Sequence, residues 1–333
     1  MQNDNVTFAL SELQAWGVCI LLSACYVGAL YLMPSRLRSL SRDNPSQIKA
    51  RFVCVACSTA FAIASLSWLA TPSAQGAPLA TWIGLPPSGA NETLVAVTLP
   101  LALTASLFLG PLVCLALITS LRRTHEWDSL HRWRPLERQR SLVSALLAEL
   151  ADRSGTADNP LGVVRNLVVG PVSEEVVFRG CFLPPLLASG VRRNTAICLS
   201  PFIFGLAHFH HLGEKLRQGH SLAAAVLPIV FQTFYTAIFG AFAAFVHVRT
   251  NHLLAPIACH VFCNFMGLPD FSFTQPLPGH LGCGPLAPLY PRRRLIWNAY
   301  IAGIVLFSAL LGPLTSPALF GSYLWYVAAG KAP

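Results

Sequence analysis

The sequence predicts an all-α integral membrane protein in which about eight transmembrane helices form one polytopic bundle around a buried polar cavity. Three observations lead to this fold class: 54% of the 333 residues are hydrophobic, only 11% are charged, and long apolar stretches recur with short polar connections. A soluble domain usually carries about 25% charged residues. Glu174 and Glu175 interrupt the fourth apolar stretch, and acidic groups at that depth usually face a protein interior or a wet cavity.

Apolar length gives the expected spans, because a helix needs roughly 20 residues to cross a bilayer. The eight expected spans are Ala15–Met33, Phe52–Ala70, Thr93–Leu121, Leu161–Ala188, Thr195–His211, Ser221–Val246, His252–Leu268 and Leu295–Leu314. Pro171, Pro184 and Pro201 lie inside the fourth and fifth stretches, so each of these spans could consist of two shorter pieces. We expect one domain over residues 1–333. It comprises spans without catalytic motifs in 1–150, catalytic core spans in 160–268, and a C-terminal span and tail in 295–333.

Basic residues indicate the orientation of the spans. Lysine and arginine clusters follow the first and third stretches, whereas residues 71–92 contain neither. The positive-inside rule therefore puts these clusters in the cytosol and both termini on the opposite side. Four basic residues fall instead in loops or the tail on the side opposite the cytosol: Arg192, Arg193, Arg249 and Lys331. Topology and anionic lipid explain the net charge of +9, so no nucleic-acid partner is expected.

Three of the apolar stretches carry the polar groups that amide hydrolysis needs. In chain order these groups are Glu174, Glu175, Arg179, His208, His260 and Asn264. A carboxylate can take a proton from water, an imidazole can orient that water or protonate the leaving amine, and an imidazole with a carboxamide can donate to the oxyanion. Packing alone does not explain so many polar groups at membrane depth, since interhelical polar contacts average only about 0.6 kcal/mol.

The adjacent glutamates are expected to differ in role. Neighbouring residues on a helix point about 100° apart, whereas Glu175 and Arg179 are four residues apart and can form an ion pair. This pairing would keep Glu175 ionised and give it a structural, supporting role. Glu174 lacks that partner, and partial burial suits it to accept a proton as the general base.

Three short motifs connect these residues to a known family. EEVVFR matches E-E-x-x-x-R, FGLAH (Phe204 to His208) matches F-x-x-x-H, and HVFCN matches H-x-x-x-N, in that order. Between Glu174 and Asn264 the sequence thus resembles the type II CAAX prenyl endopeptidases, the Ras-converting CAAX proteases of the endoplasmic reticulum. These belong to the wider CAAX-protease and bacteriocin-processing family. The length, the eight expected spans and the motif-free N-terminal half also resemble the eukaryotic members.

The resemblance implies a specific reaction and location. Such enzymes remove the last three residues from proteins whose CAAX cysteine is already prenylated. The expected partners are farnesylated or geranylgeranylated CAAX proteins such as Ras-like small GTPases, together with membrane lipid. The expected location is the endoplasmic reticulum membrane, with an active-site cavity open to the cytosol. No cofactor and no catalytic metal are implied.

The resemblance also implies a role for each motif residue. Glu174 matches the residue that activates water, and His208 matches its partner. His260 with Asn264 matches the oxyanion donors. The full expected set is catalytic Glu174, Glu175, His208, His260 and Asn264, with Arg179 and Phe204 supporting them.

Two other classes of protein remain as alternatives. A zinc hydrolase could use Glu174, His208 and His260, because two histidines and a glutamate form an established zinc set, although H-E-x-x-H is missing. A non-enzymatic membrane chaperone or a proton-coupled transporter would also carry buried Glu and His. Transporters often contain inverted repeats, and we find no convincing internal repeat. Metal analysis and an assay on a prenylated peptide distinguish these alternatives.

Overall fold

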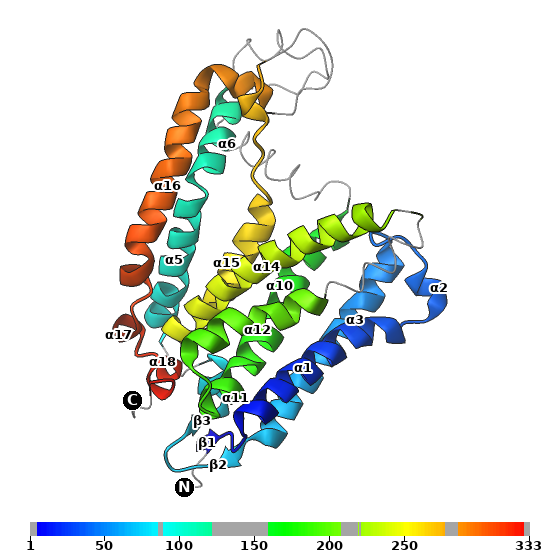
Figure 1. Cartoon of the computed structure of the whole chain (residues 1–333), viewed down its shortest axis with the longest axis vertical. Helices are drawn as coiled ribbons and strands as arrows, with labels where there is room; N and C mark the ends of the chain where they lie inside the picture. The colour runs from blue at the N-terminus through cyan, green and yellow to red at the C-terminus, as the bar shows by residue number, and fades with distance from the viewer. Residues whose placement is uncertain are drawn as a thin grey trace. The chain divides into compact units, whose positions relative to one another are not determined.

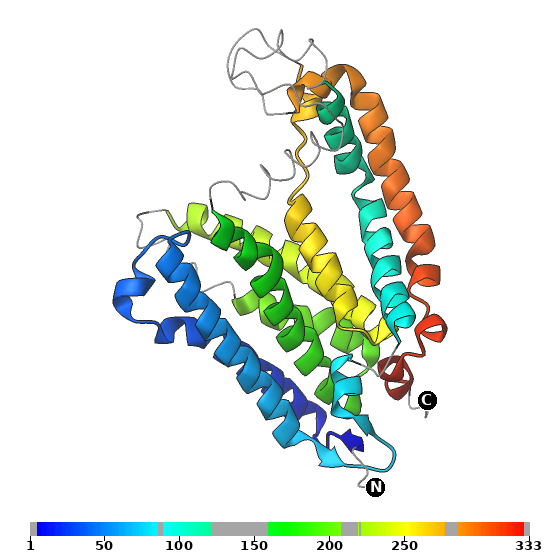
Figure 2. The ribbon, with the colours of Figure 1, turned by 180° about the vertical axis from the view of Figure 1, so that it is seen from behind.

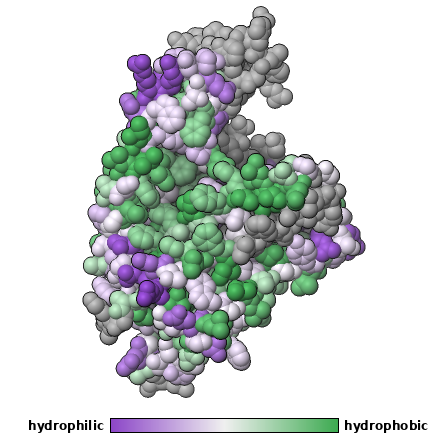
Figure 3. All heavy atoms as spheres, in the orientation of Figure 1, coloured by the Kyte–Doolittle hydropathy of each residue, from purple (hydrophilic) through white to green (hydrophobic). Residues whose placement is uncertain are grey.

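The structure is a computed structural model that describes residues 5–85, 89–121, 159–207, 219, 221–276 and 286–329. These residues are mostly helical (Figures 1 and 2). Five helical segments among them are long and apolar enough to cross a membrane: Glu12–Leu32, Pro45–Leu69, Ala90–Leu107, Leu222–Thr250 and Ala287–Leu314. Figure 3 shows hydrophobic residues over much of one face, as lipid contact requires. A helical membrane protein is therefore confirmed, whereas the number of eight spans stays a prediction.

Residue contacts divide the chain into two compact units. The first unit comprises residues 1–100, 168–260 and 315–333. The second comprises residues 101–167 and 261–314. Most of the predicted catalytic residues that the structure describes belong to the first unit.

The first unit begins with two long helices joined by a short one. Helix α1 (Glu12–Gly28) continues as η1 (Ala29–Leu32), α2 (Ser35–Arg38) follows, and α3 (Pro45–Leu69) returns along α1 (Figure 1). Ser11 caps α1 in a reciprocal capping box with Gln14, and Asn44 caps α3 just before Pro45. Both signals are typical of helix starts, because they satisfy backbone N–H groups that have no partner within the helix.

A small sheet and a short helix lie at one end of this unit. Strand β1 (Asn5–Thr7) pairs antiparallel with β2 (Thr71–Pro72) and β3 (Ala77–Pro78), in the order β2-β1-β3. Helix α4 (Leu79–Ile83) follows, and Trp82 Nε1 donates to the Val6 carbonyl at 2.8 Å. These strands hold the N-terminus to the segment that follows α3.

The fourth predicted span alternates between α-helical and π-helical turns. In chain order it contains α9 (Pro160–Val164), η2 (Arg165–Val169), α10 (Gly170–Glu175), η3 (Val176–Cys181) and α11 (Leu183–Ala188). Pro171 lies in α10, and Pro184 and Pro185 lie in α11. Proline has no N–H to donate to the residue four positions earlier, and its ring crowds that carbonyl. The π-helical turns precede both proline sites, as the loss of these backbone hydrogen bonds predicts.

Three further helices complete the part of the first unit that surrounds α10. Helix α12 (Arg193–Ala207) packs along α14 (Leu222–Thr250), and α15 (Leu254–Met266) begins after a tight turn. Asn251 ends α14 in the left-handed region with a φ of 49°, and its amide donates to the His247 carbonyl. The chain closes this unit with α17 (Pro317–Phe320) and α18 (Tyr323–Val327).

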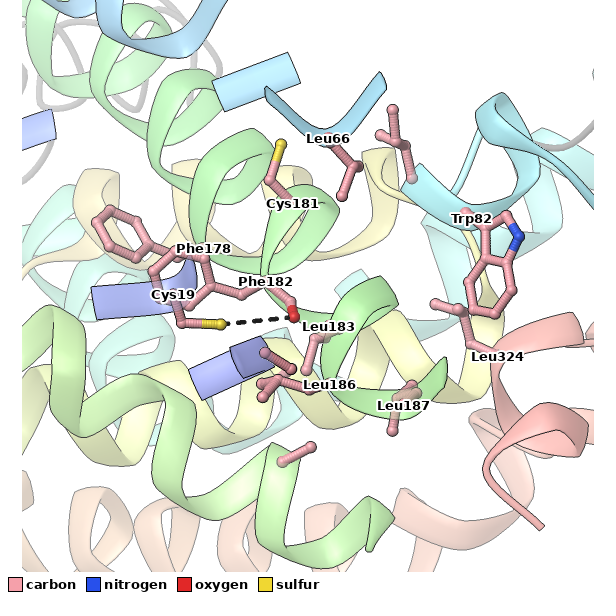
Figure 4. Close-up of a cluster of buried hydrophobic side chains, with 14 of the residues drawn as sticks. Cys19, Leu66, Trp82, Phe178, Cys181, Phe182, Leu183, Leu186, Leu187 and Leu324 are labelled. Atoms are coloured by element: carbon pink, nitrogen blue, oxygen red, sulfur yellow. Dashed lines mark hydrogen bonds between the residues drawn. The ribbon is translucent and has the colours of Figure 1, made fainter. Parts of the chain in front are cut away.

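Buried apolar side chains hold the turns around α10 and α11 in place. Figure 4 shows Phe178, Phe182, Leu183 and Leu186 packed in this core, and Cys19 Sγ of α1 donates to the Phe182 carbonyl at 3.8 Å. Phe182, Leu183 and Leu186 are fully buried. Each fully buried side chain of this size contributes roughly 1.5–3 kcal/mol of transfer free energy. The polar residues of α10 are therefore fixed by a large apolar anchor on their C-terminal side.

The second unit is built on two antiparallel helices. Helix α6 (Leu109–Leu121) packs along α16 (Arg293–Leu314), and both follow short breaks, at Phe108 after α5 (Ala90–Leu107) and at η5 (Ala287–Arg292). The third predicted span is thus two helices, α5 and α6. Close approach occurs at Gly110, where any Cβ would overlap the ring of Tyr300. The short η4 (Ser272–Thr274) adds aromatic contacts to α16.

Candidate active site

The two glutamates are the last two residues of α10, with π-helical turns on both sides. Such turns widen the helix and occur frequently at functional sites. Arg179 lies in the following turn η3. The proline pattern of this segment therefore determines the local backbone on which all three charged groups sit.

Glu175 is at the centre of a buried charge network. Its Oε1 atom accepts from Arg179 Nη1 at 2.9 Å and from His260 Nδ1 at 2.7 Å. Glu175 is 0% exposed and Arg179 is 2% exposed. The predicted ion pair between them is present. A second carboxylate contact, to an imidazole on α15, brings together two motifs that are 85 positions apart.

Glu174 occupies a different environment from its neighbour. Its side chain is 27% exposed, and its Oε2 atom lies 3.9 Å from His260 Nε2. That separation is too long for a direct hydrogen bond, which needs about 2.7–3.2 Å. The two nitrogens of His260 therefore face different glutamates, with Nδ1 bonded to the buried one and Nε2 directed towards the partly exposed one.

The cluster brings opposite charges close together. Glu174 and Glu175 contribute two carboxylates, and Arg179 contributes one guanidinium. Burial of an unpaired charge is unfavourable, so the ion pair with Arg179 explains why Glu175 can be fully buried.

Helix α14 supports the network from the other side. Arg179 Nη2 donates to the Gly240 carbonyl at 3.3 Å. A Cβ at residue 240 would lie 3.1 Å from Arg179 Nη2 and 2.6 Å from Pro201 Cβ, so only glycine allows this approach. The ring of Phe239 lies against His260, with 4.9 Å between the ring centroids. Gly240 and Phe239 carry no signal in the motifs and were missed by sequence reasoning.

Helix α1 also contributes to the region of the glutamates. The hydroxyl of Tyr26 lies 2.8 Å from Ser173 Oγ, directly before Glu174 in the chain. Ser173 Oγ in turn donates to the Val169 carbonyl at 2.7 Å. This carbonyl precedes Pro171, where the regular ladder is interrupted. Nothing in the sequence predicts that Tyr26, 147 positions away, would reach this turn.

The other predicted residues are placed less completely. Asn264 lies one turn after His260 on α15, in the second unit, where its Nδ2 donates to the Asn166 carbonyl at 2.9 Å. Phe204 lies on α12. His208 lies outside the described residues. Within the described ranges no group of three or more His, Cys, Asp or Glu has metal-binding geometry.

His247 belongs to none of the three motifs and lies directly after the predicted span Ser221–Val246. In the structure it is fully buried in α14, and its ring lies against Gly84. Gly84 has a φ of +91°, and its carbonyl accepts from the Leu253 amide at 2.7 Å. The segment after α4 therefore packs directly on the turn between α14 and α15 in the first unit.

Fold and site together define a helical membrane protein with a buried glutamate, histidine and arginine cluster. Comparison with known proteins identifies its family. The sequence model of the Rce1-like type II CAAX prenyl endopeptidases matches residues 156–266, which include Glu174, Arg179 and Asn264. The chain belongs to this family of CAAX prenyl proteases.

Similarity to curated proteins extends over nearly the whole chain. CAAX prenyl protease 2 of Homo sapiens is 37% identical over 308 residues, which cover 91% of this chain and 82% of the human protein. CAAX prenyl protease 2 of Arabidopsis thaliana is 34% identical over 328 residues, covering 96% and 94%. The Rattus norvegicus protein of the same name is 32% identical, covering 91% and 80%. No solved structure gives a significant match.

Proposed function

We propose that this chain is an intramembrane endopeptidase that removes the last three residues of prenylated CAAX proteins with a water activated by Glu174. The observation that carries the proposal is the position of His260, whose Nδ1 lies 2.7 Å from Glu175 and whose Nε2 lies 3.9 Å from Glu174. A base, an imidazole and a buried counter-charge are thus adjacent. The names of the relatives support CAAX processing as the reaction.

In the first step of the proposed reaction, Glu174 takes a proton from water and the oxygen attacks the scissile carbonyl. Protonated His260 donates from Nε2 to the oxyanion that develops, and Asn264 donates a second hydrogen bond. Glu175 accepts from Nδ1 and holds the ring in this orientation. Arg179 keeps Glu175 ionised in its buried position.

In the second step, Glu174 returns the proton to the leaving amine. The carbon–nitrogen bond then breaks and releases a tripeptide with a free amino group and a protein with a carboxylate on its prenylated cysteine. Atoms and protons balance with one water consumed. We assign His208 as the partner of Glu174 in this transfer on its motif position alone.

The prenyl group accounts for substrate selection. Burying apolar chain contributes about 0.8 kcal/mol per CH₂-sized unit, so two such units already change affinity about tenfold. A short peptide tail offers no comparable apolar area. The substrates proposed here are farnesylated or geranylgeranylated proteins such as Ras-like small GTPases. Because their tails lie in the cytosolic leaflet, the site must be open to the cytosol in the endoplasmic reticulum membrane.

The experiment is a comparison of two peptides that differ only in the thioether. One carries a farnesyl group on the CAAX cysteine, and the other carries a methyl group. We expect purified full-length protein to release the terminal tripeptide from the farnesylated peptide with a kcat/KM at least about 100-fold higher. Mass spectrometry of both products identifies the bond that is cut. Equal cleavage of the two peptides would indicate a general intramembrane protease.

The same preparation tests the alternative classes. A zinc hydrolase would contain about one zinc per chain and lose activity with its metal, whereas the proposed reaction persists in metal-free protein. A chaperone or transporter would bind the farnesylated peptide without releasing a tripeptide.

A further inference from the structure

Helix α1 runs along the segment that carries the two glutamates. Cys19 Sγ donates to the Phe182 carbonyl (Figure 4), and Tyr26, two turns later on the same face of α1, reaches Ser173. The helix and the segment therefore run antiparallel. Contacts with α1 thus hold the chain both before and after Glu174.

Tyr26 contacts this segment through both its ring and its hydroxyl. The hydroxyl lies 2.8 Å from Oγ of Ser173, the residue directly before Glu174. The ring meets the ring of Phe178 edge to face, with 5.4 Å between the centroids, and Phe178 lies four residues after Glu174. Tyr26 is 8% exposed and Ser173 is 6% exposed. One side chain of α1 therefore fixes the backbone on both sides of Glu174.

The hydrogen bonds of Ser173 determine the direction of the Tyr26 proton. Ser173 Oγ lies 2.7 Å from the Val169 carbonyl oxygen and 3.0 Å from the Gly170 carbonyl oxygen. A carbonyl can only accept, so the single hydroxyl proton of Ser173 is used there. Tyr26 must then donate to Ser173 Oγ. Its proton is committed to the turn before Glu174 and is not free to act on a substrate.

The direction of the Glu174 side chain depends on this backbone. Within the described ranges no hydrogen bond fixes its carboxylate, whose Oε2 atom lies 3.9 Å from His260 Nε2. Glu175, by contrast, accepts two hydrogen bonds of its own. A misplacement of about 1 Å can cost about 10²-fold in rate. A small shift of the turn should therefore disturb Glu174 much more than Glu175.

We propose that Tyr26 is a positioning residue for Glu174, which it directs towards water and His260 through its hydrogen bond to Ser173. Because Glu174 activates water only in the proposed function, this role of Tyr26 rests on that function. One neutral hydrogen bond contributes little to stability, whereas the position of the general base determines the rate. Rate and stability should therefore respond differently when the bond is lost.

Tyr26→Phe removes the hydroxyl and keeps the ring against Phe178. We expect the purified full-length variant to cleave the farnesylated peptide with a kcat about 10-fold to 100-fold lower, with little change in KM and a Tm within a few degrees of wild type. Tyr323→Phe is the matched control, because Tyr323 is also 8% exposed and meets Trp82 edge to face at 5.0 Å. The Tyr323 hydroxyl makes no hydrogen bond among the described residues, so this variant should keep its kcat.

Ser173→Ala tests whether Tyr26 acts through Ser173. It should lower kcat at least as much as Tyr26→Phe, and the double variant should be no slower than Ser173→Ala alone, because both changes remove the same hydrogen bond. Ser58→Ala is the matched control. Ser58 is 7% exposed and donates to the Val55 carbonyl of its own helix, so its loss should leave kcat unchanged.

Combination with Glu174→Gln tests whether Tyr26 acts on the base. Adding Tyr26→Phe should leave the residual rate of Glu174→Gln unchanged, because the group that Tyr26 positions is already lost. A further fall in that rate, or a normal kcat in Tyr26→Phe beside an inactive Glu174→Gln, would overturn the role of Tyr26 alone. Near-normal cleavage by Glu174→Gln would instead refute the proposed function, and the role of Tyr26 with it.

Discussion

Glu175→Gln should lower the stability of the protein far more than Glu174→Gln, although the two residues are adjacent. The amide keeps the shape of the side chain but removes the charge that faces Arg179 at 2.9 Å. Arg179 is 2% exposed and would then be a buried cation without a counter-charge. Breaking a buried pair in this way costs about 3–5 kcal/mol. Glu174 is 27% exposed and accepts no direct hydrogen bond from the residues that the structure describes, so its amide should cost less than about 1 kcal/mol.

Thermal unfolding of the purified variants in one detergent measures this difference. A loss of about 3–5 kcal/mol corresponds to a fall in Tm on the order of 10 °C in a protein of this size. Tm of Glu174→Gln should stay within a few degrees of wild type. The double variant Glu175→Gln with Arg179→Met removes both buried charges and should recover much of the loss.

Two outcomes of these unfolding measurements are decisive. If Glu174→Gln lowers Tm as much as Glu175→Gln, the two carboxylates do not differ in burial as the structure describes. If the effects of Glu175→Gln and Arg179→Met are additive in the double variant, the two residues are not coupled. Either result would refute the division into a buried structural glutamate and a reactive one.

Two further predictions concern the expected oxyanion donors and the close approach at Gly240. His260→Ala and Asn264→Ala should each lower turnover about 10²-fold to 10³-fold with smaller effects on KM, and a change in KM alone would make the residue a substrate-positioning group. Gly240→Ala should lower stability by about 1–3 kcal/mol, because its Cβ would lie 2.6 Å from Pro201 Cβ. Gly17→Ala on α1 is the matched control and should stabilise slightly, since no atom lies within 4 Å of its Cβ position. Equal Tm values for these two variants would contradict the close packing of α12 on α14.

The sequence predicts the parts of the site that depend on local spacing. The ion pair between Glu175 and Arg179 follows from their separation of four residues and persists through the π-helical turn. The apolar stretches predict where helices lie, and five helical segments in the described part of the chain are long enough to span a membrane. The motif order also predicts the family, which the similarity to the curated relatives confirms.

Contacts between distant elements are not readable from the same patterns. The hydrogen bond between His260 and Glu175 depends on how α15 packs near α10. Gly240 accepts a hydrogen bond through its carbonyl and allows close packing because it has no side chain. Neither property can be recognised in a sequence motif. The break at Phe108 falls just before Pro111, whose missing N–H interrupts the helix locally. The strands around Val6 depend on pairing between distant segments that hydropathy does not encode.

The role of Glu174 is tested most directly by the rate at which Glu174→Gln hydrolyses the farnesylated peptide. The variant should be used only if its Tm matches wild type and its peptide binding is retained. We predict that the rate of tripeptide release falls by roughly 10²-fold to 10⁴-fold, as expected for loss of a general base. Near-normal release by the folded variant would show that another group activates the water.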